Sequence, residues 1–226
     1  AQSLSTQQLA ALTTSQIAAL TVTNLSALDA TQVGALTTTQ IKSLTATQMT
    51  GLDAADVAEF TTTQISNLAN TQLLAMTSTN MAGLAETQIA SIAAIGVKAL
   101  TATNFAALAE TQLGALTTTQ VSSLTNTQLQ ALTSTKFSSF TETQLGALTT
   151  SQLGGISTTN LSALDATQFS AFRTTQLQTL TTTQLNGLST TDISELTTTQ
   201  IGLLTTAQVR GLSTTNIGAL SDTQVL

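Results

Sequence analysis

The feature that most constrains this chain is an eight-residue repeat that runs without insertion or deletion. An apolar residue recurs every eight positions from Leu4 to Leu220, and a second aliphatic or aromatic series with the same period runs from Leu9 to Val225. Together they divide the sequence into 28 consecutive units, the last truncated, which we call octads. The consensus over positions 1 to 8 is Leu, Thr, Thr, Thr, Gln, Ile/Leu/Val, small, Ala/Gly/Ser. Such a period predicts one continuous repeat domain over residues 1–226.

An octad cannot be part of one long helix, because eight residues turn the apolar stripe by about 80° per repeat and spread it around the cylinder. Position 2 and position 5 instead form the S/T-x-x-Q pattern of a helix capping box. Clear copies are Thr37 with Gln40, Thr117 with Gln120, Thr181 with Gln184 and Thr197 with Gln200. The pattern predicts one capped helix of about two turns in each octad.

A helix this short needs neighbours, because isolated helices of fewer than about 12 residues are marginal in water. Ile41 and Leu44 lie three residues apart and share one helix face, which is apolar enough to stack. We therefore expect an all-α solenoid. A β-solenoid is the alternative, since the chain is rich in β-branched Thr. The alternation of side chains along a strand argues against a β-solenoid, because the apolar positions 1 and 6 would fall on opposite faces of the sheet.

The exceptions to the octad have a longer period. Position 5 departs from Gln at Asn24, Asp56, Asn80, Asn104, Lys136, Asn160, Asp192 and Asn216, with Gly96 outside the series. The mean step between these positions is about three and a half octads, which predicts a superhelix with that many octads per turn. Duplication of a 56-residue segment would produce the same phasing and remains the alternative.

Charged and bulky residues follow the same period and are expected to line two edges of the superhelix. We call the first the acidic edge; it comprises Asp29, Asp53, Asp56, Glu59, Glu86, Glu110, Glu142, Asp165, Asp192, Glu195 and Asp222. The bulky/basic edge comprises the large residues at position 7, which are Lys42, Leu74, Lys98, Gln130, Gln178, Asn186 and Arg210. The two series are out of phase, so the edges should lie on roughly opposite sides and could serve as assembly or contact surfaces.

The composition excludes several classes of chemistry. Without His or Cys the chain cannot build a conventional catalytic triad or a zinc site. Five Lys plus Arg against eleven Asp plus Glu give a net charge of −6, which argues against a nucleic-acid partner. Asp53, Asp56 and Glu59 lack the loop of a calcium site. We expect no enzyme, no cofactor, no metal site and no membrane span.

Two resemblances bear on the function. The phrase LTTSQIAAL at residues 12–20 is similar to the opening helix of the DNA-reading repeats of TAL effectors, and the likeness covers that one helix. The whole array resembles the Thr- and Gln-rich octad tracts of very large bacterial surface or secreted proteins. This second resemblance implies an extracellular or cell-surface protein with a structural or adhesive role.

Three functions are therefore considered. The first is a filament, stalk or fibre that assembles as a homopolymer through the ends and edges of the solenoid, since neither end shows a polar capping repeat. The second is an adhesin segment or protein-interaction scaffold that uses the bulky/basic edge. The third is ice binding by Thr rows, which requires the flat β alternative. The sequence starts without Met and stops one residue short of a full octad, as expected of a processed product or of an excerpt from a longer array.

Overall fold

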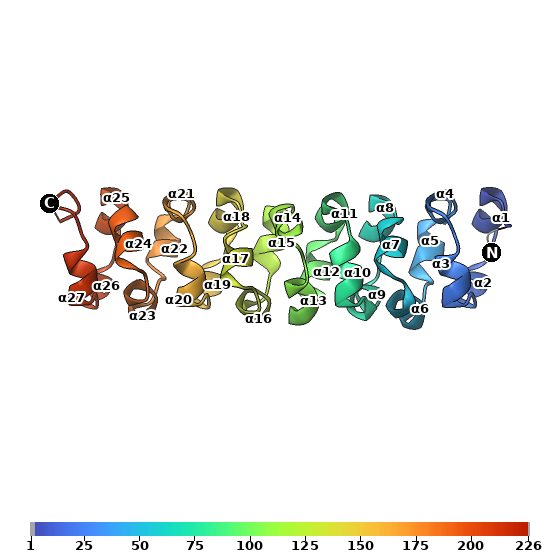
Figure 1. Cartoon of the computed structure of the whole chain (residues 1–226), viewed down its shortest axis with the longest axis horizontal. Helices are drawn as coiled ribbons and strands as arrows, with labels where there is room; N and C mark the ends of the chain where they lie inside the picture. The colour runs from blue at the N-terminus through green and yellow to red at the C-terminus, as the bar shows by residue number, and fades with distance from the viewer. Residues whose placement is uncertain (1–2, 226) are drawn as a thin grey trace. The chain divides into compact units, whose positions relative to one another are not determined.

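The computed structural model describes residues 3–225, and over these residues it is an all-α solenoid without strands. Each of the first 27 octads contains one short helix, and the last octad contains a turn (Figure 1). The prediction of one helix per octad is confirmed, and the β-solenoid alternative is excluded for the described residues. Leu226, the last residue of the truncated octad, lies outside them.

The chain divides into two compact units, Ala1–Leu116 and Thr117–Leu226. Unit 1 contains α1 (Thr6–Ala10), α2 (Thr14–Ala18), α3 (Val22–Ser26), α4 (Ala30–Gly34), α5 (Thr38–Lys42), α6 (Ala46–Gly51), α7 (Ala54–Ala58), α8 (Thr62–Ser66), α9 (Asn70–Ala75), α10 (Ser78–Gly83), α11 (Glu86–Ser91), α12 (Ala94–Ala99), α13 (Ala102–Ala106) and α14 (Glu110–Gly114). Unit 2 contains α15 (Thr118–Ser123), α16 (Asn126–Gln130), α17 (Ser134–Phe137), α18 (Glu142–Ala147), α19 (Thr150–Gly154), α20 (Thr158–Leu161), α21 (Ala166–Ser170), α22 (Thr174–Leu177), α23 (Thr182–Asn186), α24 (Thr190–Glu195), α25 (Thr198–Gly202), α26 (Thr206–Arg210) and α27 (Thr214–Gly218). A single continuous solenoid over residues 1–226 stays a prediction.

Most helices begin at a capping box, as α5 illustrates. Thr37 is extended, with φ −68° and ψ 155°, and its hydroxyl accepts a hydrogen bond from the backbone N–H of Gln40 at 3.2 Å. In return the Thr37 backbone N–H donates to Oε1 of Gln40 at 2.8 Å. The same reciprocal box caps α15, α23 and α25, which confirms the boxes expected there.

The helices are shorter than the two turns that the sequence predicts. They contain four to six residues, because the position-1 residue of the next octad must leave the helix to reach the following cap. Leu44, for example, still donates its N–H to the Ile41 carbonyl at 3.1 Å, and Thr45 is then extended as the next N-cap. No described residue has a positive φ, so the connection needs no glycine.

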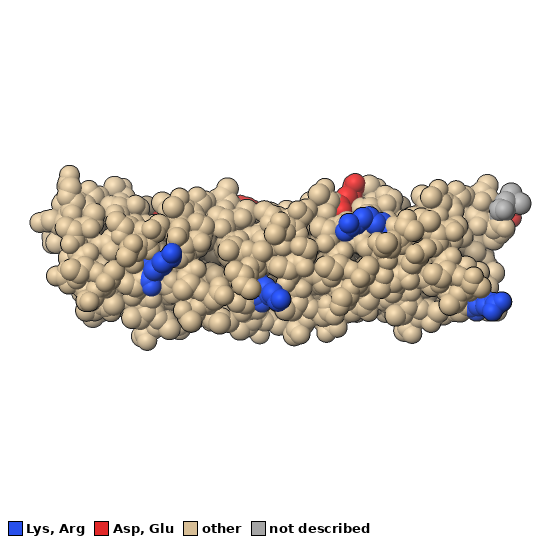
Figure 2. Space-filling model, turned by 180° about the vertical axis from the view of Figure 1, so that it is seen from behind, with Lys and Arg blue, Asp and Glu red and all other residues tan. Residues whose placement is uncertain are grey.

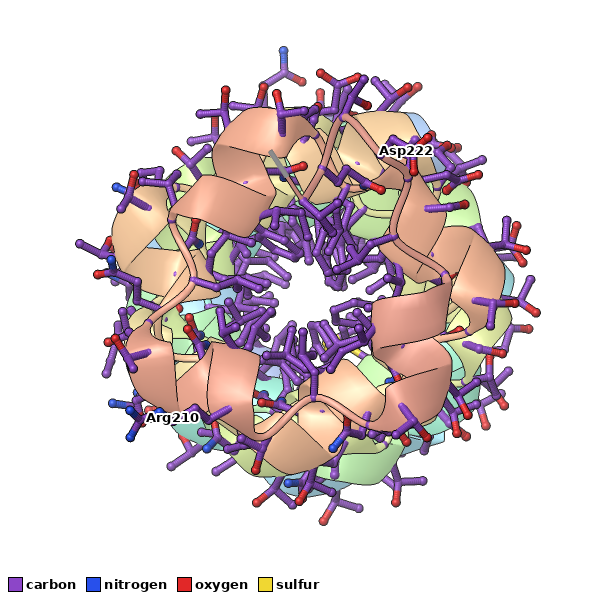
Figure 3. All side chains as sticks on the ribbon, turned by 90° about the vertical axis from the view of Figure 1, so that its left-hand side faces the viewer. Arg210 and Asp222 are labelled. Carbon is purple, nitrogen blue, oxygen red and sulfur yellow. The ribbon has the colours of Figure 1, made fainter. Side chains whose placement is uncertain are left out.

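The core lies on the inner side of each turn and is built from the position-1 and position-6 residues. Ile41 is completely buried and Leu44 nearly so. Figure 3, which looks at the C-terminal end of unit 2, shows carbon-rich side chains pointing inward, with hydroxyl and amide tips on the outside. The two series meet in the core: the rings of Phe137 and Phe140 pack edge to face with centroids 5.6 Å apart.

Successive turns are staggered by half an octad. Helix α5 packs against α2, three octads earlier, and its Gln40 also reaches the end of α1, four octads earlier. Nε2 of Gln40 donates to the Leu9 and Leu12 carbonyls, each at 2.8 Å, which lie 31 and 28 residues earlier in the chain. Each helix therefore lies over the gap between two helices of the turn before it. This confirms a superhelix of about three and a half octads per turn.

The two hydrogen bonds that the side-chain amide of Gln40 donates to the preceding turn recur in both units. We call the series of glutamines that make them the glutamine ladder. Other Gln residues whose Nε2 donates to carbonyls 28 and 31 residues earlier are Gln48, Gln64, Gln72, Gln88, Gln112, Gln152, Gln176, Gln184, Gln208 and Gln224. A helix leaves its last carbonyls without intrahelical partners, and the ladder supplies donors to them. Every buried side-chain nitrogen and oxygen of residues 3–225 has a partner.

Close approach between turns makes some position-8 glycines irreplaceable. A Cβ on Gly83 would lie 2.6 Å from the carbonyl oxygen and 2.7 Å from Cα of Ala54, and neither backbone atom can move without shifting a turn. Gly83→Ala is expected to lower the free energy of unfolding by about 1–3 kcal/mol, the usual cost of overpacking. Urea denaturation followed by circular dichroism measures the change.

Gly34 supplies the matched control in the same unit. It also ends its helix, but the nearest atom to an added Cβ is Thr61 Cγ2 at 4.0 Å. Gly34→Ala should leave stability unchanged or raise it by up to about 1 kcal/mol, since Ala favours helix. Equal losses for the two variants would show that the turns are not packed as closely as described.

Candidate functional site

Most residues of the acidic edge lie at helix N-termini. Asp29, Asp53 and Asp165 are N-caps, and Glu86, Glu110 and Glu142 are the first residues of their helices. Asp56 and Asp192 occupy position 5, Glu59 is the C-cap of α7, Glu195 ends α24, and Asp222 lies in the last turn. All are exposed except the half-buried Asp56, Glu59 and Asp192. Carboxylates near a helix N-terminus favour that helix, so most of these acids have a local structural role.

The two edges can be compared where both are labelled in one view. Figure 3 places Arg210 and Asp222 on opposite sides of the turn in unit 2, as expected for residues that are out of phase. The basic side chains do not gather into a patch: Figure 2 shows Lys and Arg as scattered single residues within each unit. The use of either edge as an assembly or contact surface stays a prediction.

The seven residues of the bulky/basic edge are all exposed, and the Gln and Asn residues among them donate hydrogen bonds to the next turn. Gln130 donates to the Gly155 carbonyl at 3.0 Å and Gln178 to the Leu203 carbonyl at 3.1 Å. Asn186 donates to the Gly211 carbonyl at 2.8 Å. Each bond spans 25 residues, so these polar side chains tie one turn to the next, a role that the sequence analysis did not foresee.

Asp at position 5 changes the direction of the bond between turns. A carboxylate cannot donate as Gln does, and here it accepts a hydrogen bond instead. The hydroxyl of Ser26 donates to Asp56 at 2.7 Å, and that of Ser162 donates to Asp192 in the same way. A signal for this pairing was present in the sequence, because the ten residues TNLSALDATQ that contain each Ser occur both at 23–32 and at 159–168.

Glu59 carries an unfavourable charge in the acidic edge. Burial raises the pKa of Glu59 above its ordinary value of 4.5, and the carboxylates of Asp56, Asp29 and Asp53 raise it further. The folded state then binds a proton more tightly than the unfolded state, so stability falls as pH rises above 4.5. Glu59→Gln should therefore raise the melting temperature at pH 7, with no gain at pH 3, and salt should reduce the gain. Thermal unfolding at the two pH values measures this.

The ionised carboxylate of Glu86 should stabilise the fold, whereas that of Glu59 destabilises it. Hydrogen bonds from its own backbone N–H and from the side chain of Thr111 lower the pKa of Glu86 below 4.5. Its charge thus adds stability above pH 4.5, and this contribution is lost as pH falls through the lowered pKa. Glu86→Gln should lower the melting temperature at pH 7 and have no effect at pH 2. A pH-independent change for either variant would show that its carboxylate is not in the described environment.

No pocket forms in the structure of residues 3–225. Among the same residues, no group of three or more Asp or Glu side chains converges in a way that could hold a metal ion. None of the helices within 3–225 has the length and apolarity needed to cross a bilayer. Comparison with protein-family models and with the curated proteins finds no match to this chain.

Proposed function

We propose that this chain is a structural protein that self-associates into a homopolymer, as a subunit or segment of an extracellular or cell-surface filament, stalk or fibre. The observation that carries the proposal is the repetition of one set of bonds between turns. Gln48 donates to the Ile17 and Leu20 carbonyls of the turn before it, and Gln184 does the same with Leu153 and Ile156 in the other unit. Contacts that join only neighbouring repeats are typical of rods that lengthen by adding repeats.

The repeat chemistry supports growth by addition of turns. The ladder amide of each octad reaches carbonyls about one turn earlier, as Gln72 does with Ile41 and Leu44. An octad therefore makes the same bonds whether the preceding turn belongs to its own chain or to another copy. The Ser- and Thr-rich outer surface offers many hydroxyls to water and no pocket within residues 3–225. These properties suit a building element better than a receptor or an enzyme.

Sedimentation velocity over a concentration series, with negative-stain micrographs of the same samples, tests the proposal. The sedimentation coefficient should rise with protein concentration at physiological salt, and the micrographs should show elongated assemblies. Dispersed single particles at every concentration would contradict it.

A protein-interaction scaffold is the second candidate, and one observation favours it. Leu74 on the bulky/basic edge is 46% exposed, although it is a large aliphatic residue. Leu74→Glu should then abolish capture of a partner while leaving self-association intact. Leu74 is a better probe than Gln130, Gln178 or Asn186, because a charge at those positions would also break bonds between turns. Ice binding is not proposed, since the flat β form that it requires is absent from residues 3–225.

A further inference from the structure

We propose that Asn186 is the site at which this chain deamidates spontaneously, and that the reaction proceeds only when helix α26 moves away from helix α23. The reactants are the chain itself and water. The product at position 186 is aspartate or isoaspartate, and neither can restore the hydrogen bond that Asn186 donates to the next turn. The inference does not depend on self-association, because the residues of this site lie within unit 2 of one chain.

Deamidation is fastest at an asparagine that is followed by glycine. The backbone nitrogen of the following residue attacks Cγ, a C–N bond forms, and Nδ2 leaves as ammonia with the proton of the attacking nitrogen. Water then opens the five-membered succinimide. Breaking of the new C–N bond gives aspartate, and breaking of the bond to the main-chain carbonyl carbon gives isoaspartate. A side chain on the following residue obstructs the attack, and glycine has none.

The sequence and the packing single out one such pair. Asn186 is the one asparagine of the chain that glycine follows, because each of the others precedes Leu, Ile, Met, Phe or Thr. The stacking of turns requires this glycine, since a Cβ on Gly187 would lie 2.6 Å from Cβ of Thr158. Both residues are exposed, so water can reach the pair. The reactive dipeptide is therefore a consequence of how closely the turns pack.

Two hydrogen bonds hold the Asn186 side chain against the next turn. Nδ2 donates to the Gly211 carbonyl at 2.8 Å, and Oδ1 accepts the backbone N–H of Ser213 at 2.8 Å. Gly211 is the C-cap of α26 and Ser213 is the N-cap of α27, so the amide is bonded on both sides to the link between these helices. While both bonds are made, Cγ cannot rotate toward the nitrogen of Gly187.

The attacking nitrogen is held as well. The N–H of Gly187 donates to the Thr183 carbonyl at 3.0 Å and closes α23. Attack requires this bond to break together with the two bonds of the Asn186 side chain. Movement of α26 breaks the side-chain bonds, and the end of a five-residue helix then frays, because short helices are marginal without their neighbours. The rate of deamidation therefore reports how often these turns open.

The product cannot close the contact in the same way. A carboxylate at position 186 can still accept the Ser213 N–H, but it has no proton to donate to the Gly211 carbonyl. Isoaspartate also adds one carbon to the main chain, which disrupts the helical spacing. Asn186→Asp carries the side chain of the aspartate product and should unfold at a lower urea concentration than the wild-type chain at pH 7. An unchanged urea midpoint would overturn the claim that deamidation weakens this contact.

Peptide mapping by mass spectrometry of the full chain, incubated at mildly alkaline pH, tests the site and its protection. In urea-unfolded protein Asn186 should react faster than Asn70, which is followed by Thr71. Folding should slow the reaction at Asn186 by at least about tenfold, which corresponds to an opening free energy of about 1.4 kcal/mol. Equal rates at Asn186 in folded and unfolded protein would overturn the proposal, and so would faster reaction at Asn70 in the unfolded chain.

Two matched variants test whether the opening is local. Gln208 of α26 and Gln48 of α6 each donate two ladder bonds to the preceding turn, the first beside Asn186 and the second in unit 1. Gln208→Glu should speed deamidation of Asn186 in the folded chain by at least about threefold, and Gln48→Glu should leave its rate unchanged. Equal acceleration by both variants, or by neither, would show that separation of α26 from α23 does not control the reaction.

Low concentrations of urea provide the same test if circular dichroism shows that Gln208→Glu is not folded. In the wild-type chain the rate at Asn186 should rise at urea concentrations below the unfolding transition, because a local opening exposes surface before the whole chain unfolds. A rate that rises only together with the loss of helical signal would place the reaction in the unfolded chain and would overturn the proposed local opening.

Discussion

Replacing Gln72 with glutamate is expected to lower the free energy of unfolding at pH 7 by about 3–5 kcal/mol, because it places a charge opposite two buried carbonyls. Gln72 accepts the Ala69 N–H at 2.8 Å and donates to the Ile41 and Leu44 carbonyls at 2.8 and 2.9 Å. Its side chain is 3% exposed. A glutamate could keep the first of these bonds, but its second oxygen would repel both carbonyls.

The loss for Gln72→Glu should depend on pH with a defined sign. Burial opposite carbonyl oxygens raises the pKa of the introduced carboxyl in the folded state, so the variant loses stability as pH rises above 4.5, the ordinary pKa of a glutamate. Below that pH the protonated carboxyl can donate one hydrogen bond, and the deficit should shrink. Urea denaturation of the variant and of the wild-type chain at pH 7 and at pH 3.5 measures the stability deficit at each pH. A deficit of the same size at both pH values would contradict the assigned bonds.

Gln16→Glu is the matched control for Gln72→Glu. Gln16 makes the same capping box, with its Oε1 2.8 Å from the Thr13 N, but its side chain is exposed. Glu serves a capping box as well as Gln does, so stability should change by less than about 0.5 kcal/mol. A loss close to that of Gln72→Glu would mean that the capping box, and not the ladder, determines the need for Gln.

Phe105→Ala is expected to cost about 3–5 kcal/mol, the usual loss for removing a buried ring. Phe105 occupies position 6 of its octad and is completely buried. In a solenoid each core residue packs against its own turn and the adjacent turns, so the cavity cannot be closed by a local shift of one helix. The change is measured as the shift in the urea midpoint, with the slope of the transition held in common.

Ile95→Ala provides the control for the core in the same unit. Ile95 is a large aliphatic residue that is 62% exposed, and it lies within α12. Its removal leaves no cavity, and Ala favours helix, so the expected change is within about 0.5 kcal/mol of zero or is stabilising. Similar losses at Phe105 and Ile95 would indicate that the core is not on the inner side of the turn.

Much of the fold could be predicted from the sequence because its signals are local and repeated. Thr37 and Gln40 define a capping box by spacing alone, and Ile41 and Leu44 define the buried face. The helix length was overestimated, because the pattern does not show that Leu44 leaves the helix to reach Thr45. The two compact units could not be predicted, since the octad does not change at Leu116 and Thr117.

The sequence analysis did not predict that the side-chain Nε2 of each ladder glutamine donates hydrogen bonds to the preceding turn. The sequence nevertheless contains a signal for these bonds. A capping box accepts Glu or Gln at its last position. Position 5 nevertheless holds Gln in most octads and Asn, Asp, Lys or Gly in the rest, and never Glu. The preference for Gln over Glu therefore pointed to a bond that the amide group makes and a carboxylate cannot, with Asp56 and Asp192 as exceptions that accept a hydrogen bond instead. The long-range partners, such as Ile41 and Leu44 for Gln72, require the pitch of the superhelix and could not be read from one octad.

The two edges were predicted from their phase, but their bonds were not. The sequence places Asp56 and Glu59 in one series, and the structure brings them together with Asp29 near enough to raise the pKa of Glu59. The sequence does not reveal that Ser26 donates a hydrogen bond to Asp56, or that Asn186 donates one to the Gly211 carbonyl of the next turn. These bonds join residues 25 to 30 positions apart, so they follow from the stacking and not from the local pattern.

The most direct test of the account is an NMR measurement of the glutamine side-chain amides. In a sample labelled with ¹⁵N at glutamine, the Nε2 protons of Gln72 should exchange slowly with solvent and give nuclear Overhauser contacts to Ile41 and Leu44. The Nε2 protons of Gln16 should exchange quickly and show no such contacts in dilute solution. Rapid exchange at Gln72, with contacts only to its own octad, would contradict a solenoid held together by the glutamine ladder.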